Sequence, residues 1–300
     1  MSEINSFADA IDAALSNIVR HGDTDIFPFP FETHIFFDRR VETRDLLLKL
    51  HANFKEWLTK YPPAHEAALA PISYNGFRWG TQLDPFWNVY FLACVIFIAK
   101  RIEQVRISAS ELKIFSYRYR YESSTGDLFN KDFGWIQFAR RSLDLASTSK
   151  YVVLCDISEF YPRLAHHRLE NALLQLDVGG DIHTKIMDLL SNYTNTRSFG
   201  LPIGGPAARL LSELVLDQID KLLKGEGIQF TRFADDYHLF VDSLEDAYRA
   251  LIILSEKLYL NQGLTLQRSK TRILSGTEFI STSPLTVDGK TSTGAMRGSW

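Results

Sequence analysis

Two adjacent aspartates between two strand-like segments constrain this chain more than any other feature. Residues 228 to 233 and 237 to 242 alternate and are rich in β-prone types, which predicts a β-hairpin with Asp235 and Asp236 at its tip. A tip that only reverses the chain more often uses Asn-Gly or Asp-Gly, because the turn needs positive φ. A divalent cation would relieve the repulsion between the two charges, since hard cations such as Mg²⁺ take oxygen ligands. For the pair alone, a solvated turn is the alternative.

A third carboxylate follows an apolar segment upstream. Tyr151 to Cys155 is predicted to be a strand, and Asp156 comes directly after it. Three converging carboxylates are what a two-metal nucleotidyl-transfer site needs, where ions about 3.5–4 Å apart activate the attacking 3′-hydroxyl and stabilise the departing pyrophosphate. Many strands also end in a solvated Asp. The hypothesis therefore depends on Asp156 lying beside the hairpin tip.

Composition indicates a folded globular protein in a reducing compartment. The 300 residues are 45% hydrophobic and 23% charged, enough for one large domain or two ordinary ones. Cys94 and Cys155 lie in apolar runs, which predicts buried free thiols and no cysteine-rich zinc site. The sequence opens without a signal-type segment, and the apolar run Val89 to Ala99 falls short of the ~20 residues that span a bilayer. We therefore expect a buried helix there, a cytoplasmic location and no membrane association.

Charge is an ambiguous guide to a nucleic-acid partner. The net charge of −3 counts against the basic footprint that nucleic-acid-binding proteins usually show. Residues 100 to 150 are locally basic, with ten Lys and Arg against six Asp and Glu. A basic band beside an acidic centre suits a polymerase, and ordinary scatter of surface charge is nearly as good an explanation.

The N-terminal part is predicted to be mainly helical. Apolar residues recur at helical spacing over 6 to 20, 41 to 59 and 85 to 107. The segment from His21 to Glu32 is rich in Phe and Pro, so we expect it to be extended.

Residues 112 to 121 alternate strongly and are predicted to form a strand. Its two faces would carry different side chains: Tyr117, Tyr119 and Tyr121 on one, Arg118 and Arg120 on the other. Guanidinium forks match phosphate oxygens, so outward-facing arginines would suit a triphosphate. An edge strand with solvated arginines has equal weight.

A glycine-rich turn precedes a long predicted helix. Gly200 to Arg209 contains Gly204 and Gly205, which let the backbone approach a ligand closely. The helix that follows would point its first N–H groups at an anion bound at the turn. A plain connection between loop and helix is the alternative.

From residue 151 onward the predicted elements follow a known order. Helices are expected over 164 to 176 and 244 to 260, and short strands over 264 to 266 and 271 to 274. With the hairpin, the order becomes β, α, β-hairpin, α, β, which is the βαββαβ pattern of a ferredoxin-like sheet. In this topology the end of the first strand can lie beside the hairpin tip.

Four segments resemble, in order, motifs of the reverse transcriptases, the right-hand polymerases with palm, fingers and thumb. Asp156-Ile-Ser-Glu-Phe-Tyr161 resembles motif A, Gly200-Leu-Pro-Ile-Gly-Gly-Pro motif B, Phe233-Ala-Asp-Asp236 motif C, and Gly263-Leu-Thr-Leu-Gln-Arg-Ser-Lys-Thr271 motif D. Four motifs in order are far more specific than any one of them. The N-terminal half and motif B are most similar to bacterial reverse transcriptases of the abortive-infection and defence-associated type.

The resemblance implies an α+β fold built on a right-hand polymerase palm. Its expected parts are a helical N-terminal region over 1–107, fingers strands over 108–150, a palm over 151–280 with inserted fingers helices over about 164–200, and the start of a truncated or missing thumb over 281–300. Only Thr277 to Ile280 is available for the primer-grip hairpin.

The resemblance also implies a metal site. Asp156, Asp235 and Asp236 would bind two Mg²⁺ ions, or Mn²⁺, with the Ile157 carbonyl assisting. Lys270 would be the motif D lysine that protonates the leaving pyrophosphate. A solvated loop lysine is the alternative for Lys270.

Nucleotide contacts follow from the same resemblance. Tyr161 falls where the family keeps an aromatic ring against the sugar 2′ position, which favours deoxynucleotides; a core aromatic is the alternative. Arg118 or Arg120 would hold the triphosphate, and Gly204 and Gly205 would border the nucleotide. Two residues depart from the usual motifs: Phe233 replaces a Tyr whose role is packing, and Ile203 replaces a residue that is often polar.

The resulting prediction is an RNA-directed DNA polymerase acting in bacterial antiphage defence. Its partners would be dNTPs and nucleic acid, as RNA template or DNA product, together with an associated RNA or partner protein; no template or primer residue is identified. Template-independent or protein-primed synthesis by the same site is one alternative. A catalytically silent nucleic-acid-binding or assembly module is another, and an unrelated ferredoxin-like fold with surface acids is a third.

Overall fold

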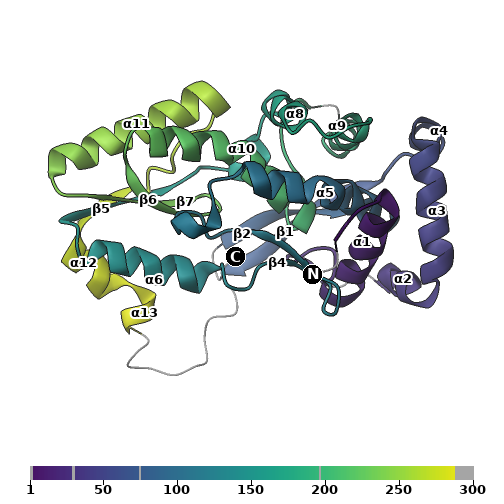
Figure 1. The fold of residues 1–300 in the computed structure, drawn as a ribbon, viewed down its shortest axis with the longest axis horizontal. Helices are drawn as coiled ribbons and strands as arrows, with labels where there is room; N and C mark the ends of the chain where they lie inside the picture. Colours follow the sequence, from purple (N-terminus) through teal and green to yellow (C-terminus); the bar gives the residue numbers. More distant parts are fainter. Residues whose placement is uncertain (1–2, 29–30, 74–75, 196, 288–300) are drawn as a thin grey trace. The chain divides into compact units, whose positions relative to one another are not determined.

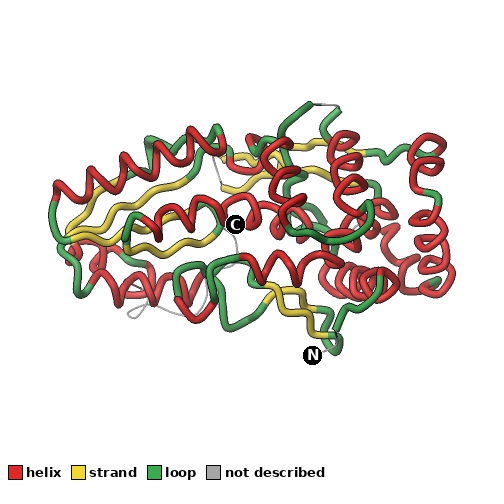
Figure 2. Tube along the Cα trace, turned by 45° about the horizontal axis from the view of Figure 1, so that its top comes forward, coloured by secondary structure: helices red, strands yellow, loops and turns green. Residues whose placement is uncertain are grey.

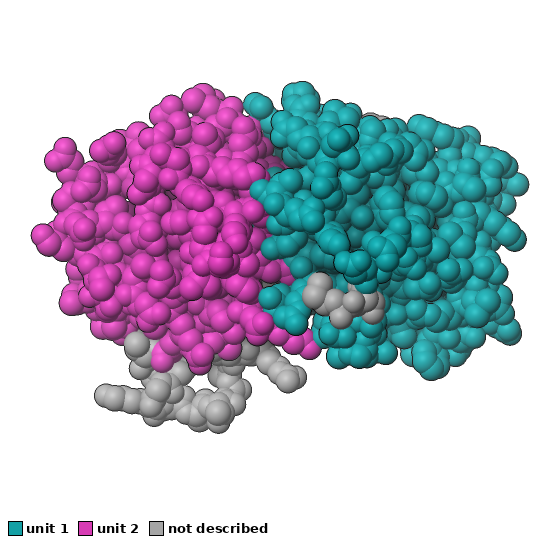
Figure 3. Space-filling model, in the orientation of Figure 1, with its two compact units in different colours: residues 1–105, 119–130, 161–214 teal, residues 106–118, 131–160, 215–300 magenta. Residues whose placement is uncertain are grey.

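Each of two structural units is assembled from three separate segments of the chain. The computed structural model describes residues 3–28, 31–73, 76–195 and 197–287. Unit 1 comprises residues 1–105, 119–130 and 161–214, and unit 2 comprises residues 106–118, 131–160 and 215–300 (Figure 3). Because neither unit is contiguous, the domain boundaries expected from the sequence stay predictions.

Unit 1 is mainly helical (Figure 1). Its helices are α1 (Phe7–His21), α2 (His34–Asp38), α3 (Arg40–Ala52), α4 (Phe54–Lys60), α5 (Pro85–Val105), α7 (Phe160–Arg163), α8 (His166–Gln175) and α9 (Ile182–Tyr193). The first begins at a capping box in which Ser6 and Asp9 accept each other's backbone N–H. It ends at Gly22, whose N–H donates to the Ile18 carbonyl. These local signals explain why the helix expected over residues 6 to 20 forms.

Helix α5 lies at the core of unit 1 and contacts both α1 and α9. Within the described chain it is the one helix with the length and mean hydropathy (1.4) to cross a membrane, but 72% of that stretch is buried inside the protein. The expected buried helix is therefore confirmed. Cys94 within it is a buried free thiol, as is Cys155 in unit 2.

Two pairs of strands complete unit 1. Strands β1 (His65–Ser73) and β2 (Gly76–Leu83) form an antiparallel hairpin, and so do β3 (Tyr119–Glu122) and β4 (Asp127–Phe129). The first hairpin was not expected, so the description of residues 1–107 as helical is incomplete. Pro71 lies within β1 and obscured the strand pattern, because proline is tolerated only at the edges of sheets.

Unit 2 is built on the predicted four-stranded antiparallel sheet. Its strands are β5 (Tyr151–Asp156), β6 (Gln229–Phe233), β7 (Asp236–Val241) and β8 (Arg272–Ser275), in the spatial order β6-β7-β5-β8. This is the strand order of a ferredoxin-like sheet, in which the first strand lies between the third and the fourth. The expected strand over 264 to 266 is wrong, because only Leu266 makes a single bridge, to Ile157.

Helices cover both faces of this sheet. They are α6 (Trp135–Ala146), the part of α10 (Pro206–Gly225) from Val215 onward, α11 (Leu244–Gln262) and α12 (Gly276–Thr282), and α13 (Pro284–Val287) contacts α12. Helix α11 contacts β5 and β7, and α6 contacts β6 and β7 from the other side, as Figures 1 and 2 show. Residues 277 to 280, considered for a primer-grip hairpin, are helical in α12. Residues 288–300, within the expected start of a thumb, lie outside the described residues.

Candidate active site

The three aspartates converge at one end of the unit 2 sheet. Asp156, the last residue of β5, is the cross-strand partner of Asp236, the first residue of β7. Asp235 directly precedes it, and its carbonyl accepts the N–H of Ile157 at 3.1 Å. The antiparallel pairing of β5 with β7 therefore produces the juxtaposition that the sequence could only suggest.

Negative charge accumulates at this point. The pKa of Asp236 is raised to about 7, first by burial and then by the neighbouring charges of Asp235 and Asp156. Carboxylates that repel one another in a partly buried site favour the binding of a divalent cation. Oxygen donors are the ligands that Mg²⁺ and Mn²⁺ prefer. The residues present thus fit the expected ions by donor type and charge. Within the described ranges, no three His, Cys, Asp or Glu side chains already stand in a metal-binding arrangement.

Lys270 is the cationic partner of this cluster. Its Nζ lies 2.6 Å from Oδ2 of Asp156. This hydrogen bond is the main cause of the raised pKa of Lys270. Backbone bonds bring the motif D segment here: the N–H of Gln267 donates to the Asp156 carbonyl at 2.7 Å, and that of Ser158 to the Thr265 carbonyl at 2.8 Å. The structure therefore joins Lys270 to the aspartates, and its role toward a pyrophosphate stays a prediction.

Replacing Asp236 with Asn should stabilise the metal-free protein above neutral pH. The carboxyl pKa is raised from 3.8 to about 7 in the folded chain. Between these values the folded state binds more protons than the unfolded state, so wild-type stability falls as pH rises through this window. We expect similar unfolding free energies near pH 4 and an advantage of about 1–3 kcal/mol for the variant at pH 8. Urea unfolding in EDTA measures the unfolding free energies of the wild type and the variant at each pH. An equal difference between the two proteins at pH 4 and pH 8 would contradict the link between the Asp236 pKa and stability.

The hairpin tip is a two-residue connection with one strained residue. Ala234 has φ of +51°, so the positive φ that the turn needs belongs to the alanine and not to either aspartate. This region costs a non-glycine residue about 1 kcal/mol or more. Phe233 is buried with Phe115 and Phe138, which agrees with a packing role for the residue that replaces the motif C tyrosine.

The expected cationic face around Arg118 is wrong. Leu112 and Tyr117 have positive φ values of 50° and 44°, which interrupt the alternation and leave only Tyr119–Glu122 as a strand. Arg118 is 2% exposed. Its Nε and Nη2 donate to the carbonyls of Ile114 and Ile107 at 3.1 and 2.8 Å. Its placement does not support triphosphate binding.

Arg120, Tyr161, Gly204 and Gly205 belong to unit 1, whereas the aspartates belong to unit 2. Arg120 is exposed, with Nη1 3.5 Å from Oδ1 of Asn130. The Tyr161 carbonyl accepts the N–H of Leu201 at 2.9 Å, which places the exit of motif A against the entry of motif B. The roles of these four residues toward a nucleotide stay predictions.

The motif B glycines have a packing reason of their own. Gly204 has φ of +120°, and a Cβ there would lie 2.1 Å from Oγ1 of Thr24. A Cβ on Gly205 would lie 3.3 Å from the Asp23 carbonyl. The turn is also held by Ile203, whose carbonyl accepts the N–H of Thr81 at 3.2 Å. Within unit 1, the segment after α1 and strand β2 therefore pack closely against this turn.

Gly204→Ala should destabilise the protein by about 2 kcal/mol or more. The new methyl group would be both strained by the positive φ and overlapped by Thr24. Gly179→Ala is the matched control, because nothing lies within 4 Å of its added Cβ, and it should change stability by less than about 1 kcal/mol. Urea unfolding compares the two. Equal midpoints for Gly204→Ala and the wild type would show that the turn adapts.

Two buried charged residues next to the hairpin tip were not predicted from the sequence. Arg232 lies in β6 and Asp220 on α10, and both are fully buried. The signal was present: an arginine in a strand otherwise suited to burial, and an acid within an apolar helix. Such charges are almost never buried unless they are paired.

The sequence itself matches a family model over a region that contains all four motifs. The model describes the reverse transcriptase (RNA-dependent DNA polymerase) and matches residues 94–290, more than half of the 300-residue chain. The chain belongs to the reverse transcriptase family. The unit 2 sheet with its three aspartates is therefore the palm of a reverse transcriptase, an α+β fold as expected.

Solved structures give a distant likeness. The apo telomerase of Candida tropicalis truncated from its C-terminal domain is 14% identical over 77% of this reverse transcriptase and 55% of that chain, with a TM-score of 0.49. Telomerase from Candida albicans in complex with the TWJ fragment of telomeric RNA is 12% identical over 74% and 47%, with a TM-score of 0.48. The present chain thus spans about half the length of these telomerase chains. No curated protein matches it.

Proposed function

We propose that this reverse transcriptase family member is an RNA-directed DNA polymerase that extends a 3′-hydroxyl with deoxynucleoside triphosphates. The observation that carries the proposal is the convergence of Asp156 and Asp236 as cross-strand partners at the end of the palm sheet, with Asp235 adjacent. Family membership alone would also fit an inactive relative. A complete set of catalytic carboxylates, kept together despite their mutual repulsion, favours an active site.

The residues of the palm divide the work of the reaction. Asp156, Asp235 and Asp236, with the Ile157 carbonyl, would hold two Mg²⁺ ions, or Mn²⁺, which supply activation of the 3′-hydroxyl and neutralisation of the pyrophosphate charge. Lys270 is protonated at neutral pH, as an ordinary lysine is, and its bond to Asp156 raises its pKa further. Its Nζ would be the general acid for the leaving pyrophosphate. Tyr161 would select the deoxyribose sugar by excluding a 2′-hydroxyl.

The proposal extends to the biological setting. The resemblance of motif B and the N-terminal half to defence-associated reverse transcriptases supports a role in bacterial antiphage defence, with a cytoplasmic location. RNA template, DNA product and dNTPs would be the partners, joined by an associated RNA or protein. These assignments depend on the subgroup resemblance and not on the palm geometry.

The test is incorporation of labelled dNTPs by the purified protein with Mg²⁺, with and without a primed RNA template. The Asp235→Asn/Asp236→Asn double variant is the control. Synthesis by the wild type alone, dependent on the template, is the expected result. Synthesis without a template would select untemplated or protein-primed extension. No synthesis under any condition, with nucleic-acid binding retained, would select the silent binding module and overturn the proposal.

A further inference from the structure

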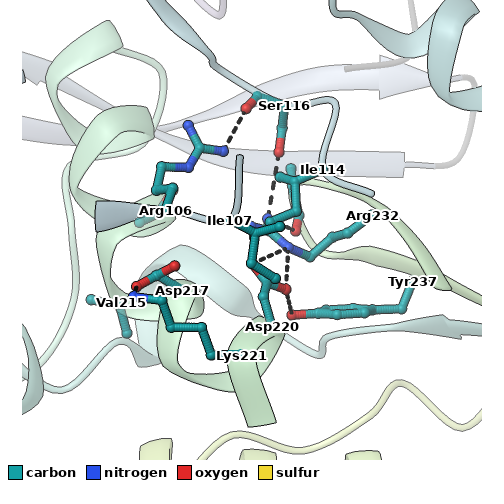
Figure 4. Close-up of polar contacts among 12 residues, drawn as sticks. Arg106, Ile107, Ile114, Ser116, Val215, Asp217, Asp220, Lys221, Arg232 and Tyr237 are labelled. Atoms are coloured by element: carbon teal, nitrogen blue, oxygen red, sulfur yellow. Dashed lines mark hydrogen bonds and ion pairs between the residues drawn. The ribbon is translucent and has the colours of Figure 1, made fainter. Parts of the chain in front are cut away.

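A buried ion pair joins Arg232, in strand β6 of the hairpin, to Asp220 on helix α10 (Figure 4). The guanidinium of Arg232 donates to Asp220 through Nε at 2.9 Å and through Nη2 at 2.7 Å. The hydroxyl of Tyr237 donates to Oδ1 of the same carboxylate at 3.0 Å. All three side chains are 0% exposed. Two strands of the hairpin and helix α10 are thus joined through one carboxylate.

The same guanidinium also reaches the hairpin tip. Nη1 of Arg232 donates to the carbonyl oxygen of Ala234 at 2.8 Å. Ala234 is the residue with strained φ of +51°, and its carbonyl carbon is bonded to the nitrogen of Asp235. Asp235 in turn accepts the N–H of Ile157, next to Asp156. Hydrogen bonds and the peptide bonds between them therefore connect α10 to the backbone that carries the three aspartates.

The backbone of Arg232 is held as firmly as its side chain. Its N–H donates to the Lys113 carbonyl at 2.7 Å, and its carbonyl accepts the N–H of Phe115 at 2.9 Å. The segment that makes these bonds is itself anchored, because Nη2 of Arg106 donates to the Ser116 carbonyl at 2.9 Å. The backbone of Arg232 is thus fixed in position, which fixes the point from which its guanidinium reaches the hairpin tip.

The energetics point to positioning more than to stability. A buried ion pair loses so much hydration that apolar residues of similar volume often serve stability equally well or better. What apolar residues cannot supply is a donor aimed at the Ala234 carbonyl. The planar guanidinium fork of arginine can donate to a carboxylate and to a second acceptor at the same time. The ammonium group of lysine has no such fork.

We propose that Asp220, Arg232 and Tyr237 form a positioning clamp that fixes the hairpin tip so that Asp235 and Asp236 bind divalent metal together with Asp156. This inference rests on the proposed function, since it assigns the clamp to the metal site of the polymerase. The three clamp residues are positioning residues, which act through the Ala234 peptide and do not touch substrate.

The experiment replaces the clamp by apolar residues so that no unpaired charge stays buried. The triple variant Asp220→Leu/Arg232→Met/Tyr237→Phe should fold cooperatively, yet bind Mn²⁺ about 10–100-fold more weakly than the wild type, the usual cost of losing groups that orient metal ligands. Exchange of the Ile157 amide in EDTA should become faster, because its acceptor belongs to the tip. In turnover, kcat should fall while KM for dNTP stays close to the wild-type value.

A matched control removes another ion pair of the same helix. Nζ of Lys224 lies 2.8 Å from Oε1 of Glu111, and both side chains are partly exposed. Glu111→Leu/Lys224→Met should leave Mn²⁺ binding and Ile157 exchange unchanged. A triple variant that folds and matches the wild type in both properties would overturn the clamp and leave the ion pair a purely structural feature.

If the triple variant does not fold, Arg232→Lys keeps the buried charge and is titrated in its place; Mn²⁺ affinity equal to the wild type would overturn the proposal, and a loss of about tenfold or more would support it. Wild type that binds Mn²⁺ but incorporates no dNTP would contradict the proposed function and leave the clamp testable by metal binding. Wild type that binds no Mn²⁺ would contradict both.

Discussion

Asp235→Asn should reduce dNTP incorporation at least about 1,000-fold, equivalent to about 4 kcal/mol of transition-state stabilisation, while the protein stays folded. The change keeps the size of the side chain but removes one of the three negative charges that converge at the end of β5 and β7. A neutral amide is a poor ligand for a hard divalent ion. Single-turnover incorporation with Mg²⁺ measures the loss, and a thermal unfolding curve confirms the fold.

The same hairpin provides the control for this result. Asp242 follows β7 and is exposed, so Asp242→Asn makes an identical chemical change away from the cluster. It should leave incorporation within about twofold of the wild type, as expected of a surface substitution. Substantial activity in Asp235→Asn would remove the hairpin from the mechanism, whatever the structure of the palm.

Tyr161→Ala should lower the preference for deoxynucleotides over ribonucleotides by about 100-fold or more. A ring beside the sugar discriminates by clash with the 2′-hydroxyl, and removing the ring removes the clash without a compensating attraction. Comparing kcat/KM for dATP and ATP measures the change. Most of the change in preference should arise from a higher kcat/KM for ATP, because dATP has no 2′-hydroxyl to clash with the ring.

Tyr161→Phe separates the ring from its hydroxyl. This variant keeps the steric obstacle and should preserve wild-type discrimination. If Tyr161→Ala retains the wild-type preference, the residue is a packing aromatic of unit 1, where its backbone carbonyl already holds the N–H of Leu201. Low activity toward both nucleotides in Tyr161→Ala, with the preference intact, would lead to the same conclusion.

The palm was predictable because its signals are local. The segments around Asp235 and Asp236 alternate with the period of a strand. The apolar run before Asp156 is bounded by charged residues, Lys150 before it and Asp156 after it. Four motifs in order then restricted the topology to one in which these elements must pair. The strand order β6-β7-β5-β8 confirms that topology.

Other elements were not predicted because backbone conformation and tertiary packing overrode a local pattern. The alternation over residues 112 to 121 is real, but Leu112 and Tyr117 adopt positive φ. Carbonyls of Ile107 and Ile114 then offer Arg118 a buried site. Periodicity cannot detect such acceptors. The β1–β2 hairpin escaped for a related reason, since a proline within a strand is acceptable only once its partner strand is known.

By itself, the sequence determined the family, the order of the palm elements and the three carboxylates that we propose to be catalytic, because periodicity, turn chemistry and motif spacing are properties of neighbouring residues. Only the tertiary structure decided that Arg118 and Arg232 are buried, that Lys270 bonds Asp156, and that Gly204 makes room for Thr24. Each of these depends on a partner whose approach is set by packing and not by the local sequence pattern. A charged side chain enters the interior only where such a partner repays its lost hydration.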